Sequence, residues 1–120
     1  MSKGYLIAHL KEHDKEGMEK FKQMSGPTIG EHGGKVLVRE PSPDVREGEN
    51  LGTVVLIEFE SIDAARKFYE SEKYQAAKAV RELAAKAHLV LVEGIKNLLI
   101  KKGIDYQIGI NPNCIKWKNF

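Results

Sequence analysis

Apolar residues are concentrated in four short segments of the chain, and these segments predict four β-strands. The segments are rich in β-branched and aromatic residues and are bounded by charged or turn-forming residues. They cover residues 4–10, 35–40, 52–59 and 88–93. Side chains of successive residues in a strand point to opposite faces of a sheet, so each segment divides into two sets of residues.

Apolar residues at helical spacing predict helices between these strands. From Met18 to Met24 every third residue is apolar, and Asp14 before them is a suitable N-cap. Pro27 is expected to kink this helix and restart it as a shorter piece, and the glycines at 33–34 are expected to end it. The connection at residues 41–50 is rich in proline and charge, which predicts an exposed, mobile loop.

Two further helical stretches precede the last strand. Ser61 and Ser71 are suitable N-caps for them, and the second stretch carries apolar residues at helical spacing up to Ala84. The resulting order is strand, helix, strand, strand, helix, strand. This order predicts an α+β, ferredoxin-like βαββαβ fold, in which a four-stranded antiparallel sheet has its helices on one face.

The two sets of strand residues predict which face of the sheet the helices cover. We assign the nearly pure apolar set to the helices: Leu6, Ala8, Leu10, Val36, Val38, Val55, Ile57, Phe59, Val90 and Val92. The opposite face then carries Tyr5, Ile7, His9, Leu37, Arg39, Val54, Leu56, Glu58, Leu89, Leu91 and Glu93. A monomer would expose this second set as a large apolar patch, which predicts a homodimer with the two sheets face to face.

The ionisable residues on that uncovered face are the first candidates for a site. They are His9, Arg39, Glu58 and Glu93. Buried charges are costly unless they are paired, so one interpretation is a set of structural ion pairs at strand ends. The other is a ligand pocket in which Glu58 transfers a proton, Arg39 holds an anionic or enolic oxygen, and His9 carries a proton. A lone histidine is also common as a packing residue.

Composition narrows the class of protein. With 120 residues, 42% of them hydrophobic and 30% charged, the chain is expected to form one soluble domain. The net charge of +2 is too small to predict a nucleic-acid partner. The single cysteine excludes an internal disulfide, and we expect no membrane span or signal peptide, hence a cytoplasmic protein. We also expect no metal site, because His9 and His13 are split between a strand end and a loop, and no cofactor.

Several segments together resemble a known family. They are residues 4–5, 33–39, 47–49, 54–59, 68–69, 74–78, 81 and 89–94. In order and spacing they are similar to the bacterial family called domain of unknown function 1330, of the dimeric α/β-barrel superfamily. The resemblance implies a ferredoxin-like fold over residues 1–94 and a homodimer whose sheets form a barrel. It implies no established reaction, although small monooxygenases share the fold.

The resemblance also adds candidate residues. The positions that fit the family pattern and are not aliphatic are Arg39, Glu58, Tyr69, Tyr74 and Arg81. We take Tyr5, Tyr69, Tyr74, Arg81 and Glu93 as candidate substrate-binding residues. Tyr69 and Tyr74 are also explained as helix-face packing with a hydroxyl at the edge, and Arg81 as one partner of a salt bridge.

Residues 95–120 lie beyond the resemblance. They contain five lysines and one aspartate, together with many large apolar residues that include the only tryptophan. A disordered tail rarely has this composition, so we expect an ordered extension that packs on the body or on the partner subunit.

These observations leave two main functions open. One is a small-molecule binder or an enzyme of the proton-transfer or monooxygenase kind, which requires a pocket at the uncovered sheet face. The alternative is a non-catalytic structural or regulatory homodimer whose barrel is packed shut. A weaker third is a partner-binding module that acts through the basic extension and associates in a salt-sensitive way.

Overall fold

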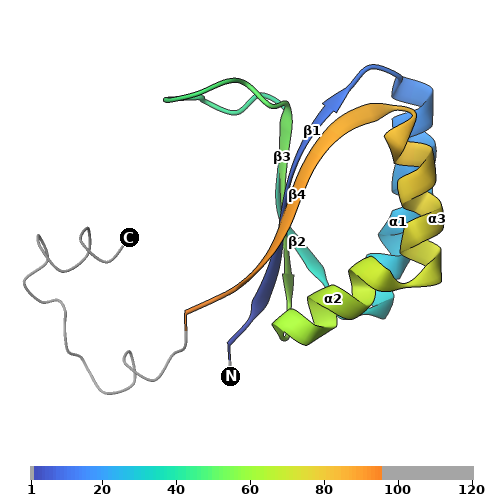
Figure 1. The fold of residues 1–120 in the computed structure, drawn as a ribbon, viewed down its shortest axis with the longest axis vertical. Helices are drawn as coiled ribbons and strands as arrows, with labels where there is room; N and C mark the ends of the chain where they lie inside the picture. The colour runs from blue at the N-terminus through green and yellow to red at the C-terminus, as the bar shows by residue number, and fades with distance from the viewer. Residues whose placement is uncertain (1, 96–120) are drawn as a thin grey trace, which may run out of the picture.

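The computed structural model of the chain describes residues 2–95 and shows four strands and three helices (Figure 1). In chain order they are β1 (Gly4–Glu12), α1 (Lys15–Glu31), β2 (Lys35–Glu40), β3 (Thr53–Phe59), α2 (Ile62–Glu70), α3 (Glu72–Glu82) and β4 (Ala85–Glu93). Residue 1 and residues 96–120 lie outside the described part, and with them the predicted C-terminal extension.

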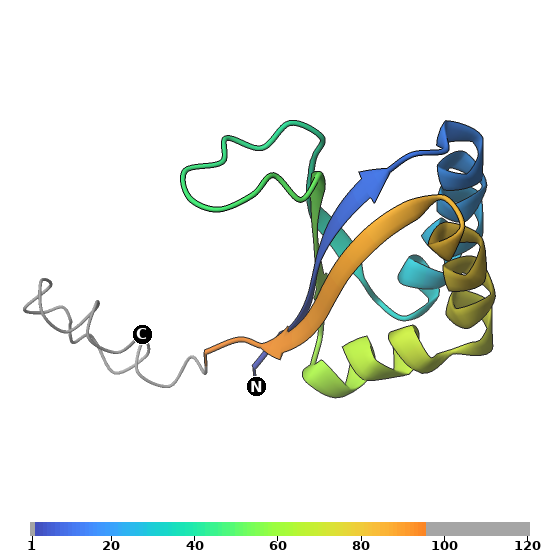
Figure 2. The ribbon, with the colours of Figure 1, turned by 45° about the horizontal axis from the view of Figure 1, so that its top comes forward.

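The strands form one antiparallel sheet in the order β2-β3-β1-β4. All three helices cover the same face of this sheet, and the opposite face is covered by no described element (Figures 1 and 2). The predicted ferredoxin-like fold is therefore confirmed. None of the described helices has the length and apolar character that crossing a membrane requires.

The predicted N-caps begin the three helices. The side chains of Asp14, Ser61 and Ser71 each accept a hydrogen bond from a backbone N–H in the first turn of the helix that follows, at 3.2, 3.0 and 3.2 Å. The predicted restart of the first helix was wrong, because α1 runs unbroken through Pro27. A proline removes one helical N–H, but the packing of an amphipathic face can offset that loss.

The core lies between the sheet and the helices. Phe59 of β3 and Phe68 of α2 are 1% exposed, and their ring centroids are 5.3 Å apart. Tyr74 of α3 packs on the other side of Phe68, with a centroid distance of 4.7 Å. The β1 and β3 residues that we assigned to the helices are all buried here, so the prediction for these two strands is confirmed.

The prediction for β4 was wrong by one residue. Leu89 and Leu91 lie directly opposite Ala8 and Leu6 and pack against the core. Val90 and Val92 point to the uncovered face and are 52% and 38% exposed. Because both alternating sets of this strand are aliphatic, its sequence does not distinguish its two faces; pairing with β1 does.

The prediction for β2 was wrong in its second half. The ladder with β3 shifts between Val36 and Val38, which leaves Leu37 as an extra residue in a β-bulge. Beyond the bulge Val38 lies opposite Leu56 on the uncovered face. Arg39 lies opposite Val55 on the helix-covered face, instead of on the uncovered face with Glu58 as predicted.

The uncovered face has an aliphatic centre and polar ends. One row across the sheet consists of Val38, Leu56, Ile7 and Val90. On one side of this row Tyr5 lies between Glu58 and Val92, and on the other side His9 lies between Val54 and His88. This arrangement is the apolar patch that the sequence predicts, with different members from β2 and β4.

The loop between β2 and β3, residues 41–52, extends away from the sheet on the side opposite the helices (Figure 2). Its own polar groups hold its shape: Arg46 pairs with Asp44 at 3.0 Å, and Asn50 Oδ1 accepts from the Gly52 N–H at 2.8 Å. Gly52 has a φ of +96°, and a Cβ there would lie 2.2 Å from the Leu10 carbonyl oxygen. Only glycine fits at this position.

Candidate functional site

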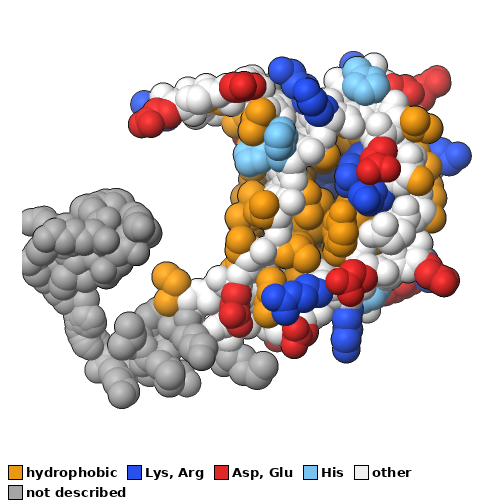
Figure 3. Space-filling model, in the orientation of Figure 1, with side chains coloured by type: hydrophobic (Ala, Val, Ile, Leu, Met, Phe, Trp, Pro, Cys, Tyr) orange, Lys and Arg blue, Asp and Glu red, His pale blue; other side chains and the backbone are white. Residues whose placement is uncertain are grey.

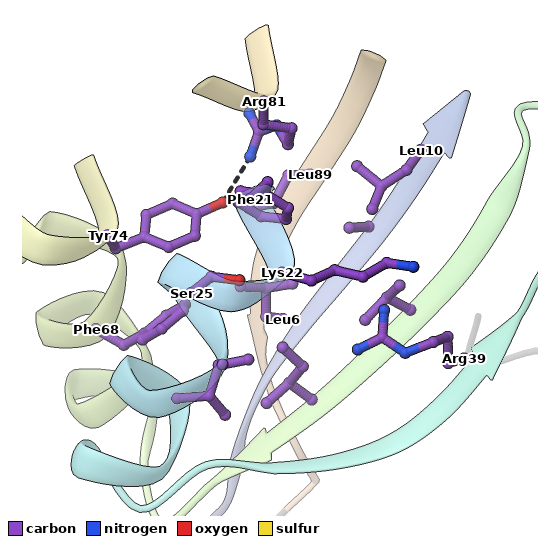
Figure 4. Close-up of a pocket in the computed structure, with 15 residues that line it drawn as sticks. Leu6, Leu10, Phe21, Lys22, Ser25, Arg39, Phe68, Tyr74, Arg81 and Leu89 are labelled. Atoms are coloured by element: carbon purple, nitrogen blue, oxygen red, sulfur yellow. Dashed lines mark hydrogen bonds between the residues drawn. The ribbon is translucent and has the colours of Figure 1, made fainter. Parts of the chain in front are cut away.

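A cavity lies between the helix-covered face of the sheet and helices α1 and α3 (Figure 4). Its volume is about 70 Å³, and aliphatic residues of β1, β3 and β4 form its floor. A second pocket of about 400 Å³ shares Leu10, Phe21, Lys22 and Arg39 with it. In Figure 3 the space between the sheet and the helices is lined by hydrophobic side chains. The two pockets therefore form one site with a narrow apolar interior and a wider outer part.

Arg81 of α3 is the buried charge of this site. It is 5% exposed, and its Nη1 donates a 2.6 Å hydrogen bond to the Tyr74 hydroxyl. The guanidinium carbon lies 5.7 Å from the centre of the Phe21 ring. Its Nε–H is buried and has no acceptor among the described residues, and no carboxylate of the described residues forms a salt bridge with it.

Tyr74 connects the aromatic core to this charge. Its ring packs against Phe68 and Tyr69, and its hydroxyl reaches Arg81. Burial raises the pKa of Tyr74 above its ordinary value of 10.0, and the positive charge of Arg81 opposes that rise. The hydroxyl therefore stays protonated at neutral pH. It accepts from Arg81, and its own proton has no acceptor among the described residues.

All of the charged side chains that line the inner cavity are positive. Arg81, Lys22 and Arg39 line it, and neither Asp nor Glu does. In Figure 4 the charged ends of Lys22 and Arg39 lie toward β2 and β3, away from Arg81. The outer pocket adds Lys11 and one acid, Glu12. The site thus presents a positive potential to a ligand that enters it.

The structure brings Arg39, Tyr74 and Arg81 together among the residues that the sequence singled out. Tyr69 is next to them, half-buried against Tyr74, and does not line the cavity. Its ring lies 5.9 Å from the Lys78 amino group.

The remaining candidates do not share this site. Tyr5 donates a 3.3 Å hydrogen bond to Glu58 on the uncovered face of the sheet, and His9 lies beside His88 on the same face. Glu93 is exposed at the end of β4 and lies opposite Gly4, on the same face of the sheet as Leu91. This is the helix-covered face, so the predicted place of Glu93 on the uncovered face was wrong. The sheet separates His9 and Glu58 from the cavity, and the predicted constellation of Arg39 with these two residues is not formed.

The sequence reasoning missed Lys22 and Ser25 of α1 and the cavity itself. Helical periodicity placed Lys22 on the wet side of α1, yet its long side chain extends along the cavity (Figure 4). Ser25 is 5% exposed and lines the cavity next to Gly26. Small residues in the middle of an amphipathic helix are the signal that could have indicated a space there.

The described residues contain no group of three or more His, Cys, Asp or Glu side chains that could hold a metal ion. The polar groups of the cavity are cationic or hydroxyl groups, which suit an anion and not a cation.

Solved structures of other proteins share this fold. A protein of unknown function from Rhodopseudomonas palustris is 17% identical, with a TM-score of 0.64 over 79% of this chain and 84% of that one. The cofactor-independent oxygenase SnoaB from Streptomyces nogalater is 12% identical, with a TM-score of 0.56 over 82% and 98%. A dimeric ferredoxin-like protein of unknown function from Thermobifida fusca is 13% identical, with a TM-score of 0.56 over 78% and 92%.

No curated protein matches the sequence. The family model named "Domain of unknown function (DUF1330)" matches residues 3–95, which is the whole described body. The site thus lies entirely within the matched region, and the chain belongs to the DUF1330 family.

Proposed function

We propose that this protein binds a small, largely apolar molecule in the site between its helices and its sheet. The observation that carries the proposal is the joined pair of pockets, with apolar walls and a few polar groups from α1, α3 and β2. Ligand sites are concave, mostly apolar and lined by a small number of placed polar groups. We assign ligand binding to Arg39, Tyr74 and Arg81.

The volumes of the two pockets suit a ligand that places one end group in the inner cavity and its larger part in the outer pocket. Single waters occupy about 30 Å³ each in the liquid, so the inner cavity of about 70 Å³ has room for one end group. The outer pocket of about 400 Å³ falls within the usual range for ligand sites. Its lining includes Pro41, the first residue of the β2–β3 loop, and Thr53, the first residue of β3.

Among enzyme classes, the likeness to SnoaB favours an oxygenase that needs no cofactor. At 12% identity that likeness reaches only the fold, so the chemistry is a proposal for this chain. Oxygen uptake that depends on an identified ligand would support it, and turnover of that ligand without oxygen uptake would contradict it.

We also propose that the protein is a homodimer joined through the uncovered sheet face. Two observations support this: the aliphatic row across that face, and the description of the Thermobifida protein as dimeric. In this dimer Tyr5, His9 and Glu58 belong to the interface, and each protomer keeps its own ligand site on the other side of the sheet.

The binding proposal is tested with a neutral fluorescent probe of apolar sites, 6-propionyl-2-(dimethylamino)naphthalene. Gly26 of α1 lines the inner cavity, and a Cβ added there meets nothing within 4 Å. We expect the unmodified protein to bind the probe and Gly26→Phe to weaken binding about tenfold or more, since the ring would occupy part of the space that ligand burial requires.

Gly30→Phe is the matched control. Gly30 is also in α1 with nothing within 4 Å of an added Cβ, and it does not line either pocket. This variant should bind the probe as the unmodified protein does. Absence of binding by the unmodified protein, or equal binding by all three proteins, would contradict the proposal.

A further inference from the structure

We infer that the ligand is a monoanion, with its ionised oxygen held by Arg81 and Tyr74 and its apolar body directed along the cavity. The inference rests on the proposed function and adds the chemical class of the ligand: a carboxylate, or an ionised enol or phenol, on an apolar framework. It is carried by two donors, on Arg81 and Tyr74, that have no acceptor among the described residues.

The first step is the uncompensated charge of Arg81. A buried cation is costly unless an anion pairs with it. Within the described residues Arg81 has only a hydroxyl oxygen at 2.6 Å and the face of the Phe21 ring at 5.7 Å. Neither carries a negative charge. A ligand anion would supply the charge that this guanidinium lacks.

The second step is the pair of donors. The Nε–H of Arg81 is buried without an acceptor, and the proton of the Tyr74 hydroxyl has none among the described residues. The Arg81–Tyr74 hydrogen bond holds the two groups together, and both residues line the inner cavity. Bonds from such donors to an ionised oxygen are about twice as strong as neutral ones. Two adjacent donors without acceptors are therefore suited to one small oxyanion.

The third step is the choice of a monoanion over phosphate or a sugar. The walls next to these donors are aliphatic, from Leu6, Ala8 and Leu89. A polyol would leave hydroxyl groups against these walls without partners, which is costly, and phosphate has no apolar surface to bury against them. An apolar body with a single charged end matches both the walls and the donors. The positive charges of Lys22 and Arg39 at the outer side would attract such a ligand.

The test compares ligands of one size that differ in charge. Titration calorimetry of the full chain at neutral pH would use benzoate as the anion, benzamide as its neutral analogue of nearly the same size, and inorganic phosphate as a small hydrophilic anion. We expect an anion to bind at least about tenfold more tightly than its neutral analogue, in keeping with the loss seen when a buried polar group stays unpaired. Equal binding of anion and neutral analogue, or tighter binding of phosphate, would overturn the inference.

Substitutions then test which residues cause the tighter binding of the anion. Arg81→Met should abolish it, and Arg81→Lys, which retains the charge and loses the Nε donor, should keep part of it. Tyr74→Phe should reduce it by removing the second donor. Lys20→Met is the matched control: Lys20 is an exposed lysine of α1 that lines neither pocket, so this variant should keep the whole preference. A preference that survives Arg81→Met would overturn the inference.

A stability measurement separates ligand binding from a structural role of Arg81. Replacing a buried charge that has no ionic partner by an apolar side chain of similar size is often neutral or stabilising. The ligand-free double variant Tyr74→Phe/Arg81→Met, which removes both ends of the Arg81–Tyr74 hydrogen bond and leaves neither group buried without a partner, should therefore unfold in urea at or above the midpoint of the unmodified protein. A strong fall in the midpoint would assign Arg81 to the structure and overturn the inference. If the neutral probe still binds while the anion preference is absent, only this inference fails; loss of both removes the proposed function as well.

Discussion

Tyr74 is the residue at which the hydrophobic core and the ligand site meet. Its ring completes the aromatic cluster with Phe68, and its hydroxyl lies on the cavity side at Arg81. A tyrosine that is 3% exposed needs a partner for its hydroxyl, and Arg81 is that partner. One side chain therefore contributes both to folding stability and to the chemistry of the cavity.

Replacing Tyr74 by phenylalanine should have a pH-dependent effect on stability. At neutral pH the variant should lose about 1–2 kcal/mol, because Arg81 Nη1 loses its acceptor. Burial raises the pKa of Tyr74, so as the pH rises above 10.0 the unfolded chain loses this proton before the folded protein does. The stability that is complete below the unfolded pKa is then lost as the pH rises through the folded pKa.

The measurement is urea unfolding of both proteins across the alkaline range. The difference in unfolding free energy between them should shrink as the pH rises above 10.0 and through the raised pKa of Tyr74, since phenylalanine does not titrate. The other tyrosines are the same in both chains and cancel in the comparison. A difference that stays constant, or grows with pH, would contradict a raised pKa at Tyr74.

Among the elements, β2 shows how one extra residue determines the chemistry of a site. Residues 36–38 are three consecutive aliphatics, so alternation along this strand has no clear phase. The bulge at Leu37 moves Arg39 from the uncovered face to the cavity. Bulges commonly redirect a side chain next to a functional site, and this one brings a cation to the outer side of the cavity.

Deleting Leu37 should be tolerated. Its side chain is 50% exposed, and without it Val36, Val38 and Arg39 keep the partners in β3 that they have now. We expect the deletion variant to fold with a change in stability within about 1 kcal/mol, typical of a surface position, and to bind the neutral probe as before. Circular dichroism and probe fluorescence measure both properties.

Deletion of Ile7 is the contrasting variant. The ladders of β1 with β3 and β4 have no bulge, so losing one residue there would move half of the strand to the wrong face. This variant should not fold. If deletion of Leu37 were as damaging as deletion of Ile7, the bulge would be essential to the sheet, contrary to what we expect.

At the scale of the whole molecule, the main feature is the uncovered face of the sheet. An apolar row with polar residues on both sides is typical of an interface between copies of one chain. The β2–β3 loop extends to the same side (Figure 2), so it would lie next to the partner in the proposed dimer.

Leu56→Glu should convert the protein to a monomer. Leu56 lies in the centre of the aliphatic row, where a dimer would bury the new carboxylate without a cation opposite it. Leu83→Glu is the control: Leu83 is 80% exposed after α3, away from this face. Light scattering after size exclusion should give twice the chain mass for the unmodified protein and for Leu83→Glu. A monomeric unmodified protein, or a dimeric Leu56→Glu, would contradict the proposed interface.

By itself the sequence determined the elements, their order and the buried faces of β1 and β3. Capping is a local property, because Asp14, Ser61 and Ser71 each act within one helical turn. The pattern of apolar residues is local as well, and in these two strands only one face is purely apolar. The side-by-side position of Tyr74 and Arg81 also follows from the chain, because seven residues make two helical turns.

Tertiary structure alone decided the location of the site. The faces of Arg39 and of β4 depend on register with a neighbouring strand, which aliphatic runs do not specify when both faces are apolar. The cavity exists because residues from helices and sheet leave a space that none of them shows separately. The sequence directed attention to the uncovered face. Packing placed the guanidinium of Arg81, which forms no salt bridge with a described carboxylate, on the other side of the sheet.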